Sequence, residues 1–287
     1  MSASARVRLA FSPDSDDIFM FWAALFGKID TEGLEFQVER SDTESLNARA
    51  AAADLDVMAL SVAAWPSVAD RYLLLSSGMS VGRGYGPILA ARRPVTLASL
   101  DSARIGVPGL RTTAYLVLRL LLPRFEAVIV PIVPFERVFD SVRSGDVDAA
   151  LVIHEGRVTF EREGLASVCD LGEEWARLTG GLPLPLGANA VRRALGRETV
   201  ERVSRVCRVS IEWALTHRED TMRALIEGED RQGLRLTRTM LDRYLAMYAN
   251  ADTLEAPPDV RRAVDVLYER GHAAGLLEGP TRAEYAR

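Results

Sequence analysis

The sequence has few of the side chains that most metal and Schiff-base sites require. Its 287 residues include two cysteines, Cys169 and Cys207, and three histidines. Two cysteines are too few for a metal cluster, so structural zinc is not expected. Lys28 is the only lysine, and it follows Gly27 at the expected end of a helix. A surface lysine is a poor Schiff-base former, which argues against pyridoxal-phosphate and class I aldolase chemistry.

Long apolar runs and basic patches are missing as well. No segment approaches the ~20 uninterrupted apolar residues of a membrane-spanning helix, so no membrane contact is expected. The net charge is −5, and no basic patch with interleaved aromatic residues is present, which argues against a nucleic-acid partner. The first residues lack the apolar region and cleavage site of a signal peptide. We therefore expect a cytoplasmic protein in which both cysteines are reduced thiols.

The patterns that are present are typical of a globular α/β protein. Apolar residues make up 48% of the chain and charged residues 26%. Short apolar runs alternate with helical patterns, which predicts an α/β fold. We expect strands at residues 7–11, 34–38, 57–60, 72–75, 88–91, 104–107, 128–131, 147–153 and 166–171. Helices are expected at residues 18–26, 41–53, 112–122 and 135–142, and only helices from 198 to 275, with breaks near His217, residues 228–233 and residues 256–258.

Two segments are typical of crossings between domains. Residues 82–86 contain three glycines, but the spacing is not that of a dinucleotide-binding loop, and a strand follows where such a loop requires a helix. Residues 182–189 are expected to be extended, because two prolines exclude a helix. We therefore expect two lobes joined by two crossing strands, with residues 1–88 and 187–287 in lobe I and residues 89–186 in lobe II. Such lobes enclose a ligand-binding cleft.

His154 lies where an expected buried strand, residues 147–153, comes to an end. In open α/β sheets ligands bind just beyond the carboxyl ends of the strands. An imidazole at that place can take up a proton near neutral pH, where its ordinary pKa is close to 6.5. A histidine that is only hydrogen-bonded into a loop is an equally good interpretation of this stretch alone. His217 and His272 lie in charged helical surroundings and are expected on the surface.

Other polar side chains follow expected strands and could line the same cleft. They are the segment from Ser12 to Asp17, Ser61, and the pair Thr112 and Thr113. Threonines at a helix start can cap the helix, or can offer hydroxyl and N–H groups to a carboxylate or phosphate of a ligand. Glu155 could orient the imidazole of His154, or could simply begin the next helix.

Several longer segments carry a family resemblance. The most specific are IHEGR at residues 153–157 and TGGLPLPLG at residues 179–187, supported by VPGLRTTAYL at 107–116 and RRAVDVLYERGHAAGL at 261–276. They resemble the 1,4-dihydroxy-6-naphthoate synthase family of the futalosine route to menaquinone over nearly the whole chain. The resemblance implies a type II periplasmic-binding-protein fold used as an enzyme, a carbon–carbon lyase. Its substrate would be cyclic dehypoxanthine futalosine, and its products 1,4-dihydroxy-6-naphthoate and dihydroxyacetone.

The resemblance also implies roles for individual residues. His154 matches the general base of the family, and no metal or organic cofactor is implied; a homodimer is allowed. The residues implied to bind substrate are Ser12, Asp14, Asn47, Ser61, Thr112 and Thr113. The chain departs from the family pattern Ser-Pro-Cys-Pro-Asn-Asp, which here reads Ser12-Pro13-Asp14-Ser15-Asp16-Asp17. Ala59 stands where the family has a lysine, and Gly156 where it has a serine.

Two alternatives stay open at this point. The same fold would serve a solute-binding protein without catalysis. The histidine at the cleft and the absence of a signal peptide argue against that function. The chorismate dehydratase of the same pathway shares the fold, and the IHEGR segment favours the naphthoate synthase over it.

Overall fold

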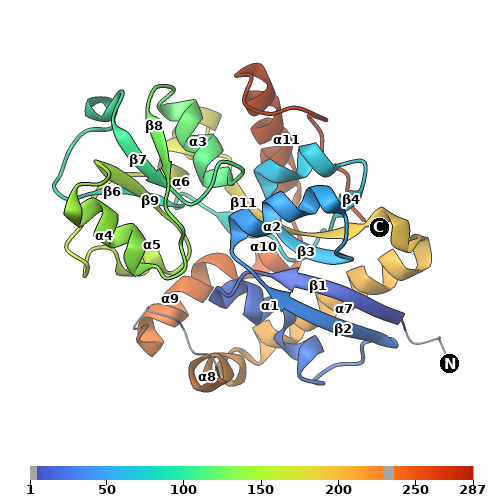
Figure 1. The fold of residues 1–287 in the computed structure, drawn as a ribbon. Coiled ribbons are helices and arrows are strands. Elements are labelled where there is room, and N and C mark those ends of the chain that lie inside the picture. Colours follow the sequence, from blue (N-terminus) through green and yellow to red (C-terminus); the bar gives the residue numbers. More distant parts are fainter. Residues whose placement is uncertain (1–4, 229–235, 287) are drawn as a thin grey trace.

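The chain forms two β-sheets, each covered by helices (Figure 1). The computed structural model describes residues 5–228 and 236–286. The first sheet has the strand order β2-β1-β3-β11-β4, with β5 also paired to β11. Its strands are β1 (Ala5–Phe11), β2 (Leu34–Arg40), β3 (Val57–Ser61), β4 (Tyr72–Leu74), β5 (Ser80–Gly82) and β11 (Leu184–Arg192). β1 is parallel to β2 and β3, whereas β11 is antiparallel to β3, β4 and β5.

The second sheet has the strand order β10-β6-β9-β7-β8. Its strands are β6 (Ile88–Ala91), β7 (Arg104–Val107), β8 (Glu126–Ile129), β9 (Ala149–Val152) and β10 (Ala166–Asp170). β9 is completely buried, as its run of apolar residues predicted. It is parallel to β7 but antiparallel to β6, so the expectation of a parallel sheet at this strand is wrong and the sheet is mixed.

Helices cover both sheets. They are α1 (Ser15–Leu25), α2 (Thr43–Arg49), α3 (Thr113–Leu121), α4 (Glu136–Ser144), α5 (Gly156–Thr159), α6 (Leu171–Thr179), α7 (Arg197–Thr216), α8 (Arg218–Gly228), α9 (Arg238–Tyr248), α10 (Ala251–Leu254) and α11 (Pro258–Ala273). The predicted breaks at His217 and before Pro258 are confirmed, and the break at 228–233 falls mostly outside the described residues. None of the described helices combines the length and apolar character needed to cross a membrane.

The chain passes from one sheet to the other twice. The first passage is the glycine-rich turn between β5 and β6, where a Cβ on Gly82 would lie 1.9 Å from the carbonyl oxygen of Tyr85. Only glycine therefore permits this turn. The second passage leads from α6 into β11, with Pro183 just before the strand and Pro185 inside it. Both predicted crossings are confirmed, since β1–β5 and β11 lie in one sheet and β6–β10 in the other.

Two local predictions need correction. β8 ends at Ile129, so it begins and ends two residues earlier than expected. Leu171, expected at the end of a strand, instead begins a helix, α6, where Asp170 accepts a hydrogen bond from the N–H of Gly172; this helix ends at Gly180 with φ +71°. The prediction of an extended segment at 182–189 is confirmed from Leu184 onward by a long strand, β11, which lies between β3 and β4 in the first sheet.

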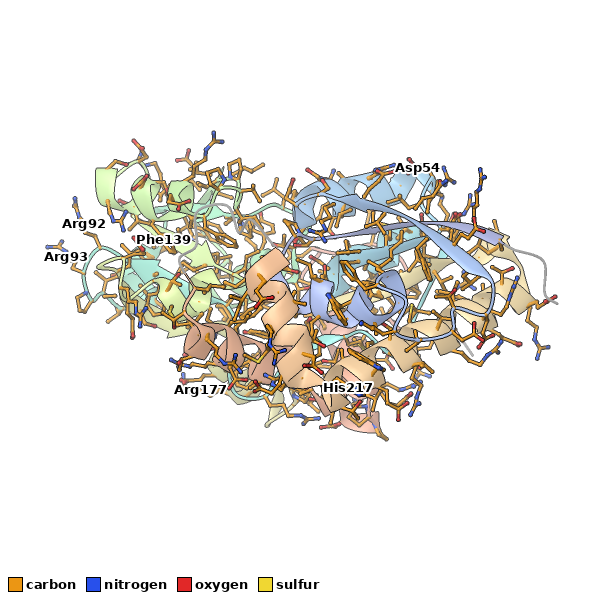
Figure 2. All side chains as sticks on the ribbon, turned by 90° about the horizontal axis from the view of Figure 1, so that it is seen from below. Asp54, Arg92, Arg93, Phe139, Arg177 and His217 are labelled. Atoms are coloured by element: carbon orange, nitrogen blue, oxygen red, sulfur yellow. The ribbon has the colours of Figure 1, made fainter. Side chains whose placement is uncertain are left out.

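Charged side chains and two of the histidines lie on the outside of the molecule, as expected. Seen from below, the side chains of Arg92 and Arg93 project from one end of the molecule, and Phe139 lies inside the part that contains the second sheet (Figure 2). His217 lies on the outside, stacked on Trp213, and His272 is exposed as well, as predicted. Both cysteines are free thiols, which confirms the expected reduced state.

Candidate active site

A cleft of about 770 Å³, partly open to solvent, lies where the two sheets face each other. The ends of β1 and β3 contribute Ser12, Asp14 and Ser61 to its wall, and the start of α3 contributes Thr112 and Thr113. His154, at the end of β9, completes the set from the second sheet. The structure thus brings together the polar residues that follow predicted strands, because those strand ends meet at the cleft.

His154 is held in an unusual backbone conformation. Its φ is +49°, a left-handed value that residues other than glycine seldom adopt. Its side chain is only 16% exposed, and the ring of Phe135 packs edge-on with the ring centroids 6.3 Å apart. Such a conformation costs on the order of 1–3 kcal/mol and is typical of functional sites. The backbone conformation and the ring of Phe135 together hold His154 at the cleft.

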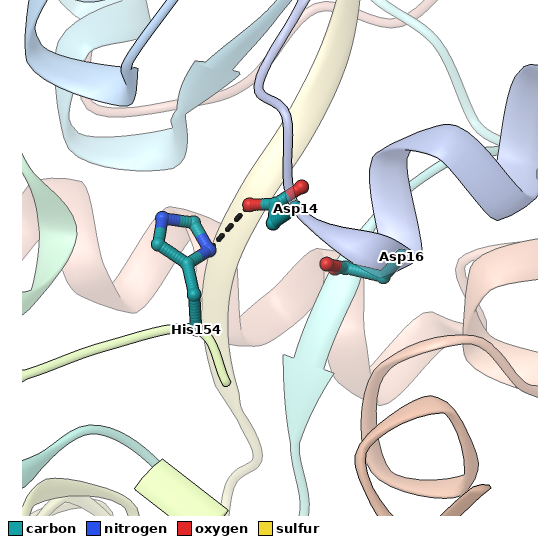
Figure 3. Close-up of side chains that lie close together, drawn as sticks. All are labelled: Asp14, Asp16 and His154. Atoms are coloured by element: carbon teal, nitrogen blue, oxygen red, sulfur yellow. Dashed lines mark ion pairs between the residues drawn. The ribbon is translucent and has the colours of Figure 1, made fainter. Parts of the chain in front are cut away.

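The imidazole of His154 pairs with a carboxylate from the opposite sheet. Its Nδ1 contacts Oδ2 of Asp14, whose side chain is 5% exposed (Figure 3). Its Nε2 lies 3.1 Å from Oγ1 of Thr43. Burial alone would lower the pKa of His154, but the charge and hydrogen bond of Asp14, helped by Asp16 and Glu155, raise it to about 9. The expected pKa near 6.5 is therefore wrong.

Asp14 is stabilised in its charged form by the same pair. Burial would raise the pKa of Asp14, but the attraction and hydrogen bond of His154 lower it below its ordinary value. The backbone N–H of Asp14 lies 3.4 Å from Oγ of Ser12, and one carboxylate oxygen has no hydrogen-bond partner within the described residues. The pair is thus a carboxylate with an imidazolium at neutral pH.

Two further carboxylates crowd the start of α1. Asp16 accepts hydrogen bonds of 2.6 Å from Ser80 and of 2.6 Å from the hydroxyl of Tyr244. Burial and the negative charge of Asp14 nevertheless raise the pKa of Asp16 to about 7. Asp17 accepts a hydrogen bond from the N–H of Ser12, and burial with the repulsion of Asp14 and Asp16 raises its pKa well above the ordinary value. The cluster therefore retains protons that isolated carboxylates would lose.

Glu155 joins the two sheets directly next to His154. Its Oε1 accepts hydrogen bonds from the backbone N–H of Ser15, 2.9 Å away, and from the hydroxyl of Ser15. Ser15 is the first residue of α1, where the helix dipole favours a negative charge. Glu155 thus binds the start of α1, which follows β1 of the first sheet. From the sequence, Glu155 was expected either to orient His154 or to begin the next helix, and neither interpretation included this contact.

Ser61 and Asn47 form a buried unit at the end of β3. The side-chain amide of Asn47 donates to Oγ of Ser61 at 3.0 Å, and its oxygen accepts the N–H of Ser61 at 2.8 Å. Ser61 lines the cleft, and since its oxygen already accepts a bond, its own hydrogen can be donated to a ligand. Asn47, expected to contact substrate, lies behind Ser61 and does not line the cleft.

The two threonines at the start of α3 both use their hydroxyls within the protein. Thr112 caps the helix by accepting from the N–H of Tyr115, and donates to the carbonyl of Gly109. Thr113 donates to the carbonyl of Leu186 and accepts from the N–H of Ala63. Capping is thus confirmed for Thr112. The donors left for a ligand at this helix start are the N–H groups of Thr113 and Ala114, because those of Tyr115 and Leu116 donate to Thr112.

The departures from the family pattern fall in different places. Ala59 lines the cleft, so the missing lysine changes the cleft itself. Gly156 is buried in the first position of α5, where a Cβ would lie 2.7 Å from Cγ1 of Val152. A serine there would require the neighbouring backbone or Val152 to shift. The glycine is therefore a packing difference and not a direct change in the cleft wall.

Several cleft residues escaped the sequence analysis. Tyr244 and Tyr248 come from α9, in the helical C-terminal region, where nothing in the pattern distinguished them from other buried aromatic residues. Arg157 belongs to the IHEGR segment; it donates to the carbonyl of Gly86 at 2.6 Å and pairs with Asp170. Thr43 could have been noticed at the start of α2, whereas Asp16 was included in the segment from Ser12 to Asp17 that was expected at the cleft.

The geometry of the acidic cluster would also admit a cation. Asp14, Asp16 and His154 place donor atoms within 4.8 Å of one another. One oxygen of Asp14 pairs with His154 and the other has no partner within the described residues, whereas both oxygens of Asp16 accept hydrogen bonds.

Comparison with known proteins identifies the family. A family model described as menaquinone biosynthesis matches residues 7–273. The 1,4-dihydroxy-6-naphthoate synthase of Thermus thermophilus is 38% identical over 94% of this chain and 95% of its own length. This chain belongs to that family. The synthase of the same name from Streptomyces coelicolor is 34% identical over 96% of both chains. The expectation of an enzyme of menaquinone biosynthesis is confirmed.

Solved structures support the fold. Protein AF1704 from Archaeoglobus fulgidus is 40% identical, with a TM-score of 0.88 over 95% of this chain and 98% of that one. The alkanesulfonate-binding protein SsuA from Xanthomonas axonopodis pv. citri is only 14% identical, yet its TM-score is 0.72 over 97% of this chain and 96% of that one. The predicted two-lobe fold of type II periplasmic binding proteins is therefore confirmed.

Proposed function

We propose that this member of the family converts cyclic dehypoxanthine futalosine to 1,4-dihydroxy-6-naphthoate and dihydroxyacetone, with His154 as the general base. The observation that carries the proposal is the position of His154. Its imidazole lies at the end of a central strand, inside the cleft, with Nε2 directed at the cleft wall formed by Thr43. A base so placed can take a proton from a carbon acid, which typically contributes ~10²–10⁴ in rate.

The other cleft residues are proposed to hold the substrate. Ser12 and Ser61 offer hydroxyls at the ends of β1 and β3. Thr112 and Thr113 place the first turn of α3 against the cleft, where N–H groups and the helix dipole favour a carboxylate of the substrate. Asn47 acts through Ser61, whose hydroxyl it orients. The expected absence of a metal or cofactor stays a prediction.

Lobe I is proposed to comprise residues 1–88 and 187–287, and lobe II residues 89–186. Contacts across this division support a closed arrangement, since Glu44 binds the N–H and guanidinium of Arg111, and Glu155 binds Ser15. Closure would exclude water from the cleft and orient the substrate. The proposed compartment is the cytoplasm, and the homodimer that the sequence left open can be tested by light scattering.

The test is to incubate the purified protein with cyclic dehypoxanthine futalosine and to detect the naphthoate by mass. His154→Asn should lower turnover at least ~10²-fold, the lower end for loss of a general base. Near wild-type turnover by that variant would mean that His154 is structural. Binding without turnover by the wild type would favour a solute-binding protein, and dehydration of chorismate would favour the sibling enzyme.

A further inference from the structure

The proposed base comes from one sheet and its hydrogen-bond partner from the other. Asp14 follows β1 and His154 follows β9, and the two side chains meet in the cleft (Figure 3). We propose that Asp14 is the positioning residue of the base: its carboxylate fixes the imidazole so that Nε2, and not Nδ1, takes the proton from the substrate. This inference rests on the proposed function, and it concerns a residue that replaces the cysteine of the family pattern.

The hydrogen-bond pattern determines which ring nitrogen can act as the base. An ionised carboxylate can only accept a hydrogen bond, so the Nδ1 that contacts Asp14 must carry a hydrogen. In the neutral imidazole the lone pair then lies on Nε2. That nitrogen is hydrogen-bonded to the hydroxyl of Thr43, 3.1 Å away, and Thr43 lines the cleft. A substrate in the cleft would therefore reach Nε2 by displacing the hydroxyl of Thr43, whereas Nδ1 stays bound to Asp14.

Both partners are anchored by their neighbours in the chain. Glu155, next to His154, binds the N–H and hydroxyl of Ser15, which is next to Asp14. The left-handed backbone of His154 turns the imidazole toward the first sheet, and Phe135 packs against its edge. The contact between Glu155 and Ser15 therefore holds the carboxylate of Asp14 and the imidazole of His154 close to each other.

Other charged groups surround the imidazole without replacing Asp14. Asp16 and Asp17 face it from α1, Tyr244 from α9, and Glu155 and Arg157 from its own segment. Among the described residues, the acid that hydrogen-bonds the ring is Asp14. Since the pKa of His154 is raised to about 9, kcat/KM should increase with pH until the imidazole loses its proton in that range.

The reaction balances without another reactant. The C–H proton of the substrate moves to Nε2, and the C–H electron pair stays with the substrate and drives cleavage of the C–C bond. Nε2 then returns this proton to the departing fragment, so no water is consumed. Asp14 and His154 thereby return to the reactive form, in which the imidazole is neutral with hydrogen on Nδ1 and none on Nε2.

The experiment compares pH profiles of kcat/KM for the wild type, Asp14→Asn, Asp14→Glu and Asp16→Asn. Asp14→Asn should move the acid limb from about pH 9 toward the ordinary histidine value of about 6.5, and should lower the plateau at least about tenfold because the tautomer is no longer fixed. Asp14→Glu should keep the high midpoint. Asp16→Asn is the matched control. The carboxylate of Asp16 lies near the imidazole but does not hydrogen-bond the ring, so the pH midpoint of the acid limb should move less in this variant than in Asp14→Asn.

A second measurement does not depend on turnover. Nitrogen NMR of imidazole-labelled protein reports the tautomer and pKa of His154, assigned by the signals lost in His154→Asn. The exposed His217 and His272 serve as internal references. Above about pH 9, where the ring is neutral, the wild type should show hydrogen on Nδ1 and none on Nε2, and the pKa of His154 should fall in Asp14→Asn. An unchanged pKa and pH profile in Asp14→Asn, or a neutral wild-type ring with its hydrogen on Nε2, would overturn the inference. A failure to form naphthoate would instead refute the proposed function.

Discussion

The pair of Asp14 and His154 should stabilise the fold as well as serve the reaction. Removing the imidazole leaves the carboxylate of Asp14, whose side chain is 5% exposed, without its cationic partner. Breaking a buried pair from one side costs ~3–5 kcal/mol, because an uncompensated charge stays buried. Asn suits the perturbation, since it tolerates a left-handed backbone better than most residues and should not strain position 154, where φ is +49°.

The magnitude follows from the pKa of His154. Its rise from 6.5 to about 9 favours the protonated, folded form. At about 1.4 kcal/mol per pKa unit, that rise corresponds to about 3 kcal/mol. The contribution of His154 is complete below its unfolded pKa of 6.5 and is lost as the pH rises through about 9. The contribution of Asp14, whose pKa is lowered, is present above 3.8 and is lost as the pH falls below that value.

The assay is a double-mutant cycle of urea unfolding with His154→Asn, Asp14→Asn and the double variant. At about pH 6, where both partners are charged in the folded state, the coupling free energy should be about 2–3 kcal/mol. The double variant should recover much of the stability lost by His154→Asn, because it no longer buries an unpaired charge. At about pH 10 the coupling should be largely lost, because the imidazole is then neutral.

Arg124 and Asp101 provide the control pair. Their side chains are 79% and 40% exposed, and their closest contact is 2.9 Å. Exposed pairs of this kind contribute about 0–1 kcal/mol. If the coupling of Asp14 with His154 at about pH 6 is no larger than that of the control pair, the reasoning from burial and charge is refuted.

Four further outcomes are expected. Ser61→Ala should raise KM by the equivalent of about 0.5–1.5 kcal/mol, with a smaller effect on kcat, in steady-state kinetics. Thr112→Val should lower the free energy of unfolding by about 1 kcal/mol in urea melts, because the hydroxyl of Thr112 caps α3. Small-angle scattering should show compaction when a substrate analogue saturates the protein, and an unchanged radius of gyration would indicate a preformed site. Gly156→Ser should destabilise the protein by about 1–3 kcal/mol in thermal melts, because its Cβ would lie 2.7 Å from Cγ1 of Val152.

Local sequence patterns were sufficient to predict several of the residues that line the cleft. Buried apolar runs predicted the central strands, and the polar residues after them, Ser12, Ser61 and His154, line one cleft as expected. Composition and the prolines also predicted both crossings. Strand ends in an α/β fold meet at one edge of the sheet, so their positions follow from element order alone.

Contacts between distant segments could not be predicted in this way. The pairing of Asp14 with His154, and the contact of Glu155 with Ser15, depend on how the two sheets face each other. Tyr244 reaches Asp16 from the C-terminal helices, where its amphipathic pattern looked like ordinary packing. The raised pKa of His154 arises from these contacts, which is why an ordinary value was expected from the sequence.

The departures at positions 14 and 16 are physically linked. Where the family pattern has cysteine and asparagine, this chain has two carboxylates beside the same imidazole. Asp14 stays charged because His154 compensates it, and its charge in turn helps to raise the pKa of Asp16 to about 7. Asp16 can therefore lose its proton near neutral pH only at the expense of repulsion from Asp14. Protonation of Asp16 removes that repulsion, so Asp14 can stay charged beside His154. The substitutions at positions 14 and 16 therefore affect the protonation of the same cluster.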